Sequence, residues 1–351
     1  MKKRDKVYVE TKKYKWHIRH LKRCIRRNNK NKHKQQKQSI NALKEDKRKQ
    51  VVFSAPLKFS IIKNANETCK FLKKITDFLK TKSTKNVIVF IDLFNVQYMT
   101  TDAVMYLLAI ICNMKNRTER KISFKGNQPK DAEACKLLQQ SGFFRFVKSA
   151  ATRINQNGNN VQIISGQDVN GEIIKELVEF INRNCFTKIK FTQELYDVFV
   201  ELMNNTVQHA YDKSEILSER NWYLYASANK EKIKIVFLDT GLGIAETVHR
   251  DWGEYFRDIA RKDDGYYVES ALKGEFRSRT GKKYRGNGLP AVYNYSKRDE
   301  VNRFQIHTGK SISKVQNNGE LYSKEVEQPL YGVLYYWEIK KEKIGKEYMY
   351  D

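Results

Sequence analysis

One predicted helix carries a carboxylate, an amide and an imidazole at every fourth position. Residues 201–210 read ELMNNTVQHA, so Glu201, Asn205 and His209 lie along one helix face. The opposite face is apolar and comprises Leu195, Val198, Phe199 and Leu202. A carboxylate can orient or deprotonate an attacking water, and an amide oxygen can hold Mg²⁺ without adding charge. Taken alone, the same pattern also fits an ordinary solvated helix face.

Two glycine-bearing turns follow this helix in the chain. Residues 239–244, DTGLGI, come directly after an apolar strand. Asp239 could accept a hydrogen bond from an adenine amino group, and the two glycines permit close backbone approach to a ligand. Residues 286–290, GNGLP, precede a predicted helix, where glycine amides suit a phosphate. Each of these turns is by itself common in ordinary loops.

Together the three motifs resemble the N, G1 and G2 boxes of GHKL ATPases, the family of gyrase, Hsp90, histidine kinases and MutL. E-x-x-x-N-x-x-x-H-A comes first, D-x-G-x-G-I second and G-x-G-L third. The style is closest to the anti-sigma-factor and histidine-kinase branches. The resemblance implies that residues 189–345 form a two-layer α/β sandwich that binds ATP with Mg²⁺.

The resemblance also implies a role for each matched position. Glu201 would be the general base or water-orienting carboxylate, and Asn205 the Mg²⁺ ligand. Asp239 would bind the adenine amino group. An ATP lid would span residues 277–285, although its cations equally suit a solvated charge run. The further positions implied to line the nucleotide site are His209, Gly241, Gly243, Arg277, Arg279, Lys282, Lys283, Arg285, Gly286, Gly288 and Leu289.

Two positions depart from the family pattern. The G2 box usually continues G-L-G, whereas here Leu289 is followed by Pro290, which removes a backbone donor. Family members often place Thr after the glycine of the last strand, and here that position is Val333. We expect ATP binding to survive both changes, while the rate of turnover stays open.

The elements that must position these motifs divide the chain into four parts. These are a basic arm (1–50), a small α/β domain (51–150), a linker and connecting segment that opens with the polar stretch 151–160 (151–188), and the ATP-binding domain (189–345). In the small domain, the pattern predicts strands over 86–93 and 121–124 and helices over 101–114 and 131–140. In the last domain it predicts helices over 191–211 and near 289–297, with strands over 222–228, 232–238, 303–308 and 331–340.

Residues 87–147 resemble, more faintly, a STAS domain of the anti-sigma-antagonist kind. The stretch 137–147, LLQQSGFFRFV, is similar to the closing stretch of that family. The family's phosphoacceptor turn, D-S-S-G, reads TTDA here, so Asp102 takes the phosphoacceptor position and would imitate the charge of a phosphate. Thr100 and Thr101 remain open as acceptors. An unrelated small α/β domain remains open as the alternative.

The charge and the cysteine content limit the possible binding partners and the cellular compartment of the protein. The formal net charge is +27, and residues 1–50 hold 20 Lys and Arg against 4 Asp and Glu. That arm suits nucleic-acid phosphates, a membrane surface or an acidic protein, and equally a plain disordered tail. The longest apolar run, Ala103 to Cys112, is too short to span a bilayer. Five scattered cysteines without C-x-x-C, and no signal-like apolar segment, predict a cytoplasmic protein.

Three functions fit these observations. The first is an ATPase whose lid closure regulates docking of the N-terminal domain or of a partner protein. The second is an anti-sigma-type serine/threonine protein kinase that acts on a partner or on Thr100 or Thr101. The third is a non-catalytic, nucleotide-gated protein that binds nucleic acid through residues 1–50. GHKL domains often form homodimers, although no coiled-coil heptads in this sequence require one.

Overall fold

The structure is a computed structural model, and it describes residues 48–81, 86–115, 122–148, 156–157, 159–185, 189–209, 221–252, 262–276, 288–316 and 318–341. The chain divides into two compact units, residues 1–49 and 50–351. Nearly all of the first unit lies outside the described residues, as does the lid predicted over 277–285. The predictions made for the basic arm and for the lid therefore concern residues outside that part.

Residues 50–148 form an α/β layer. Strands β1 (Gln50–Ser54), β3 (Ile88–Asp92) and β5 (Ser123–Gly126) make a parallel sheet in the order β1-β3-β5, and β2 (Lys58–Phe59) pairs with β4 (Tyr98–Met99). The helices are α2 (Ala65–Lys80), α3 (Thr101–Lys115), α4 (Ala132–Gln140) and α5 (Phe143–Lys148). Parallel neighbours require crossover connections, which α2 and α3 supply. The α/β class predicted from the sequence is confirmed.

Helix α3 is the centre of this layer because its sequence is apolar on every side. All residues from Ala103 to Ile111 are buried, as expected for a helix that is hydrophobic all round. The prediction of a helix over 101–114 is confirmed to within one residue. The side chain of Asp131 caps α4 by accepting a hydrogen bond from the Ala134 amide at 2.9 Å. The strand predicted over 121–124 begins two residues later, at Ser123.

The rest of the chain builds a six-stranded sheet in the order β10-β11-β9-β8-β7-β6, in which every neighbouring pair is antiparallel. The strands are β6 (Gln156–Asn157), β7 (Asn160–Gly166), β8 (Trp222–Ala228), β9 (Lys232–Asp239), β10 (Val301–Val315) and β11 (Leu321–Lys340). The helices are α6 (Gly171–Asn184), α7 (Ile189–His209), α8 (Ile244–Trp252), α9 (Asp264–Lys273) and α10 (Gly288–Ser296). The predicted strands over 222–228 and 232–238 are confirmed, whereas β10 and β11 are longer than predicted.

The segment predicted as a linker and connection contains strands and a helix within its described residues, 156–157 and 159–185. Strands β6 and β7 extend the sheet beyond β8, and α6 follows them. The apolar residues of β7, Val161, Ile163 and Ile164, are all fully buried. The polar residues next to them in the sequence made the strand pattern difficult to recognise. Asn170 caps α6 by accepting hydrogen bonds from the amides of Glu172 and Ile173, each at 3.1 Å. Because burial of these side chains depends on pairing with β8, the local pattern alone did not reveal the strand.

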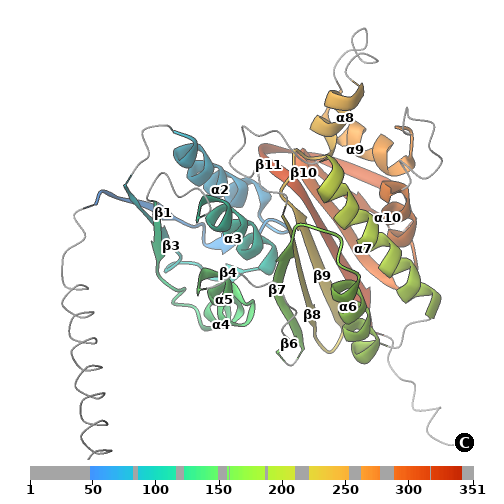
Figure 1. Cartoon of the computed structure of the whole chain (residues 1–351), viewed down its shortest axis with the longest axis horizontal. Coiled ribbons are helices and arrows are strands. Elements are labelled where there is room, and N and C mark those ends of the chain that lie inside the picture. The colour runs from blue at the N-terminus through green and yellow to red at the C-terminus, as the bar shows by residue number, and fades with distance from the viewer. Residues whose placement is uncertain are drawn as a thin grey trace, which may run out of the picture. The chain divides into compact units, whose positions relative to one another are not determined.

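Both faces of this sheet are covered. Helices α6, α7 and α10 pack on one face, and α3 with its neighbours packs on the other (Figure 1). Successive residues of β8 point to opposite faces, so that Tyr223 and Tyr225 join the core with α3, while Leu224 and Ala226 join the core with α7. No helix in the described ranges is long and apolar enough to cross a membrane.

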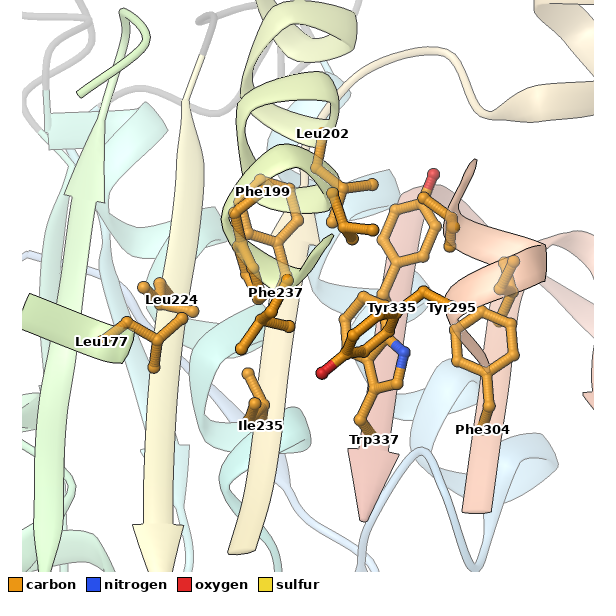
Figure 2. Packing of buried hydrophobic residues seen from close by; sticks show 14 of the residues in the cluster. Leu177, Phe199, Leu202, Leu224, Ile235, Phe237, Tyr295, Phe304, Tyr335 and Trp337 are labelled. Atoms are coloured by element: carbon orange, nitrogen blue, oxygen red, sulfur yellow. The ribbon is translucent and has the colours of Figure 1, made fainter. Parts of the chain in front are cut away.

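Aromatic side chains fill the core between α7 and the sheet (Figure 2). The ring of Phe199 on α7 lies 5.8 Å from the ring centroid of Phe237 and 5.8 Å from that of Trp337. Tyr335 stacks on Trp337 with centroids 5.8 Å apart and an interplanar angle of 10°. These contacts fix α7 over β9 and β11, and α7 carries Glu201 and Asn205.

We expect Phe237→Ala to lower the free energy of unfolding by about 3–5 kcal/mol, because the ring is fully buried and its removal leaves a cavity. Phe94→Ala removes the same group from a site that is 48% exposed, and should cost less than about 1 kcal/mol. Urea unfolding monitored by circular dichroism measures both variants. Equal losses would show that the aromatic core does not hold the sheet to α7.

Candidate functional site

Helix α7 presents its polar face as the spacing predicts. Its apolar side, with Leu202 and Phe199, is buried, while Glu201 and Asn205 are only half-buried. Burial raises the pKa of Glu201, and the nearby carboxylate of Asp197 raises it further. His209 is the last residue of α7, and its side chain lies outside the described residues.

Asp239 ends β9 and meets α7 at Thr206, which is fully buried on the apolar side of that helix. The residue is 8% exposed, and its carboxyl accepts a hydrogen bond from the Gly241 amide at 2.6 Å. Burial raises its pKa to about 6, although hydrogen bonds from the Gly241 amide and from the Thr206 side chain on α7 lower it. The Asp239 carboxyl is therefore hydrogen-bonded both to Gly241 in the second motif and to Thr206 in the first, so the two motifs are in contact.

The glycines of the turn after Asp239 are required by close backbone approach. Gly243 has φ +93°, and a Cβ there would lie 2.7 Å from the Thr308 Oγ1. Gly332 on β11 has φ +83°, and a Cβ there would lie 2.0 Å from the Asp239 carbonyl oxygen. Only glycine adopts these conformations without strain and leaves room for the neighbouring backbone. Helix α8 begins directly after this turn, so its first amides face the same region.

The third motif meets the first at Gly288. This residue is buried and is the first residue of α10 (Gly288–Ser296), which agrees with the helix predicted near 289–297. A Cβ on Gly288 would lie 2.7 Å from Glu201 Oε2 and 3.4 Å from Asn205 Nδ2. The start of α10 therefore touches both polar side chains of α7. Segments separated by more than 80 residues in sequence converge on one place.

The remaining predicted positions divide into two groups. Gly241 is buried in the turn after Asp239, and Leu289 packs against the apolar core. The positions outside the described residues are Arg277, Arg279, Lys282, Lys283, Arg285 and Gly286. Within the described ranges, no three His, Cys, Asp or Glu side chains are arranged to hold a metal ion. A metal at this site would rest on Asn205 together with ligand and water oxygens.

One residue of the site was missed by sequence reasoning. Thr308 on β10 pairs with Val333 on β11, and its hydroxyl accepts a hydrogen bond from the Ile244 amide at 3.1 Å. A threonine hydroxyl thus lies beside the glycine turn, but it comes from the neighbouring strand and not from position 333. Only the strand register places Thr308 there, and no signal within residues 303–308 indicates it.

Asp102 does not present a charge at the surface. Its side chain is 1% exposed and accepts hydrogen bonds from the amides of Ile61 and Ile62, at 2.7 and 3.2 Å. Burial raises the pKa of this carboxyl. The Asp102 carboxyl therefore lies inside the fold, where it holds the loop that follows β2, and its likeness to a phosphate charge stays a prediction.

The pH dependence of stability should depend on Asp239. Its pKa is about 6 in the fold against an ordinary 3.8, so the unfolded chain releases the proton first and stability falls as pH rises between these values. Asp239→Asn lacks this titration. We expect the free energy of unfolding of Asp239→Asn, minus that of the wild type, to increase by about 1–1.5 kcal/mol between pH ~5 and pH ~8.

Urea unfolding at the two pH values measures this difference. The control is Asp299→Asn, at an exposed position, which should leave the pH dependence of the wild type unchanged. A constant difference between Asp239→Asn and the wild type across this range would contradict the assignment of the buried titration to Asp239.

No protein-family model matches the sequence, and no curated protein sequence matches it. Among solved structures, the chain is similar to one described as the SiaB-SiaC complex from Pseudomonas aeruginosa. The identity is 13% and the TM-score is 0.26, with 52% of this chain and 91% of that chain covered. A likeness at this TM-score leaves both fold and function to be argued from the residues of the chain itself.

Proposed function

We propose that this chain is a Mg²⁺-dependent ATP-binding protein of the GHKL type. The observation that supports the proposal best is the contact of Gly288 with Glu201 and Asn205. It brings the third motif onto the first, while Asp239 and Thr206 bring the second motif onto the same helix. Unrelated surface loops that contain these short sequences by chance would not be expected to contact one another.

Each residue would have a distinct task in this proposal. The Asp239 carboxylate would accept a hydrogen bond from the adenine amino group, in a buried setting where such a bond discriminates strongly. The amides at the start of α10 would face the phosphates, since a helix N-terminus favours anions. Asn205 would supply an oxygen to Mg²⁺. Bound Mg²⁺-ATP would supply the γ-phosphoryl group, Glu201 would orient or deprotonate the water that accepts it, and ADP would be the leaving group.

The kinase alternative shares Glu201 and Asn205, but the fold argues against transfer to the chain's own threonines. Thr100 and Thr101 lie at the start of α3, on the face of the sheet opposite α7. Thr101 is also buried. A γ-phosphate beside Glu201 is separated from both hydroxyls by the sheet, so a kinase of this kind would act on another protein. Incubation with γ-labelled ATP, followed by mass spectrometry, distinguishes hydrolysis from transfer.

Nucleotide binding and turnover should separate in two variants. We expect Asp239→Ala to abolish ATP binding, because it removes the adenine acceptor. Glu201→Ala should retain binding and lose turnover by a factor of at least ~100, as expected for loss of a general base. Calorimetry and phosphate release measure the two effects. The matched exposed controls, Asp299→Ala and Glu246→Ala, should behave as the wild type.

The outcomes bear on different parts of the proposal. If the wild type fails to bind ATP with Mg²⁺, the whole proposal is wrong. If it binds ATP but Glu201→Ala turns over ATP as fast as the wild type, the assignment of catalysis to Glu201 is wrong while ATP binding stands.

Two glycine variants test the geometry of the site. In Gly288→Ala, the new methyl meets the flexible end of Glu201, so the fold should persist while turnover falls at least ~10-fold. In Gly332→Ala, the methyl meets backbone at a left-handed φ, and we expect a loss of stability of about 2 kcal/mol or more. Melting temperature and turnover distinguish them. Equal destabilisation by both would mean that Gly288 serves packing alone.

A further inference from the structure

A cleft of about 510 Å³ lies on the face of the sheet opposite the candidate nucleotide site. One wall is formed by β8, β9, β10 and β11, and the other by the loops around β4 and by α4. The volume is within the range of small-molecule pockets, about 300–1,000 Å³. None of the proposed ATP-site residues lines it, so the cleft is a separate site.

The sheet wall carries an excess of positive charge. Neighbouring strands bring Lys234, Glu338 and Arg303 into one cross-strand row, because Glu338 pairs with both of the others. Lys232 donates to one oxygen of Glu338 at 2.7 Å, and the Tyr336 hydroxyl donates to the other at 2.5 Å. Both oxygens of this carboxylate are thus already engaged. Lys234 and Arg303 make no ion pair within the described residues.

Neutral groups hold Arg303 in place. Its Nη2 donates to the Gln305 side-chain oxygen at 3.2 Å, and its guanidinium carbon lies 5.8 Å from the centroid of the Tyr336 ring. An arginine supported in this way keeps its charge and several donors for a ligand. Lys234 is half-buried, and burial is the main cause that lowers its pKa. Lys232 and Lys63 lower it further, whereas the carboxyl groups of Glu338 and Asp102 raise it.

The opposite wall adds two cations, Lys63 and Lys136, and the exposed carboxylate of Glu133 on α4. Lys63 stands at the rim, with its Nζ 5.2 Å from the centroid of the Tyr98 ring. The carboxyl of Asp102, which also lines the cleft, is held by the Ile61 and Ile62 amides. Cations from both walls therefore act on one half-buried ammonium group. An anion bound between the walls would offset these like charges.

We propose that this cleft binds a small ligand through a phosphate group held by Lys63, Lys234 and Arg303. A phosphate carries close to two negative charges near neutral pH and three acceptor oxygens, and so matches three donors on separate elements. Five cations line the cleft against three carboxyl groups, and a phosphate offsets this excess more completely than a single carboxylate does. Arginine is suited to phosphate because its planar fork can donate two parallel hydrogen bonds. The remainder of such a ligand would meet the rings of Tyr98, Tyr225 and Tyr336, which line the cleft.

Protection of amines from acetylation tests the site with inorganic phosphate as the probe. Wild-type protein is acetylated with and without phosphate at one ionic strength, and the modified lysines are quantified by mass spectrometry. We expect phosphate to slow acetylation of Lys234 and Lys63 several-fold, with Lys230 unaffected. Lys230 is a matched control because it lies in the exposed turn before β9 and does not line the cleft.

Variants then connect protection to affinity. Lys234→Gln and Arg303→Gln should each weaken phosphate binding at least ~10-fold, since each removes a charge-assisted hydrogen bond. Lys230→Gln and Asp239→Ala should leave protection of Lys63 unchanged, and the latter separates this cleft from the proposed ATP site. Melting temperatures without phosphate should change little in Lys234→Gln, because Glu338 keeps its hydrogen bonds from Lys232 and Tyr336. Equal slowing at Lys234 and Lys230, or unchanged binding in both cleft variants, would overturn the proposal.

Discussion

The burial of both faces of one antiparallel sheet is the constraint on which the rest of the structure depends. Strand β9 has consecutive buried residues, Val236, Phe237 and Leu238, that belong alternately to the core with α3 and the core with α7. A strand buried on one side only would alternate apolar with polar positions. Because water must be excluded from both faces, residues 50–148 and the helices around α7 are each needed to complete the fold.

The same constraint fixes the candidate sites on both faces. Side chains alternate along β9, so Phe237 and Asp239 are directed to α7, while Lys234 and Val236 are directed to the cleft. A shift of register by one residue would exchange the two sets. It would bury Lys234 among aromatic rings and withdraw Asp239 from Thr206. Apolar burial on both faces therefore determines where the carboxylate and the cations stand, although neither takes part in the packing.

Much of this arrangement is predictable from the sequence, and the limits have physical causes. Helices α3 and α7 and strands β8 and β9 follow from local periodicity, because each is long enough to repeat its pattern. Strand β7 was missed, since its apolar residues are few and their burial depends on partners elsewhere in the chain. Of the site, the three motifs indicated Glu201, Asn205, Asp239 and Gly288. Their contact depends on packing, which spacing in sequence does not describe.

Thr308 and the cleft depend on strand pairing, which the spacing of residues in the sequence does not reveal. The Thr308 hydroxyl reaches the glycine turn only because β10 pairs with β11 in a particular register, and Arg303 joins Lys234 for the same reason. A basic residue in an amphipathic strand is ordinarily solvated, so nothing in the sequence distinguished Lys234 from Lys230. The difference arises when residues 50–148 cover the sheet and remove water from one of them. Tertiary burial thus lowers the pKa of a strand lysine that local sequence does not distinguish from its solvated neighbour.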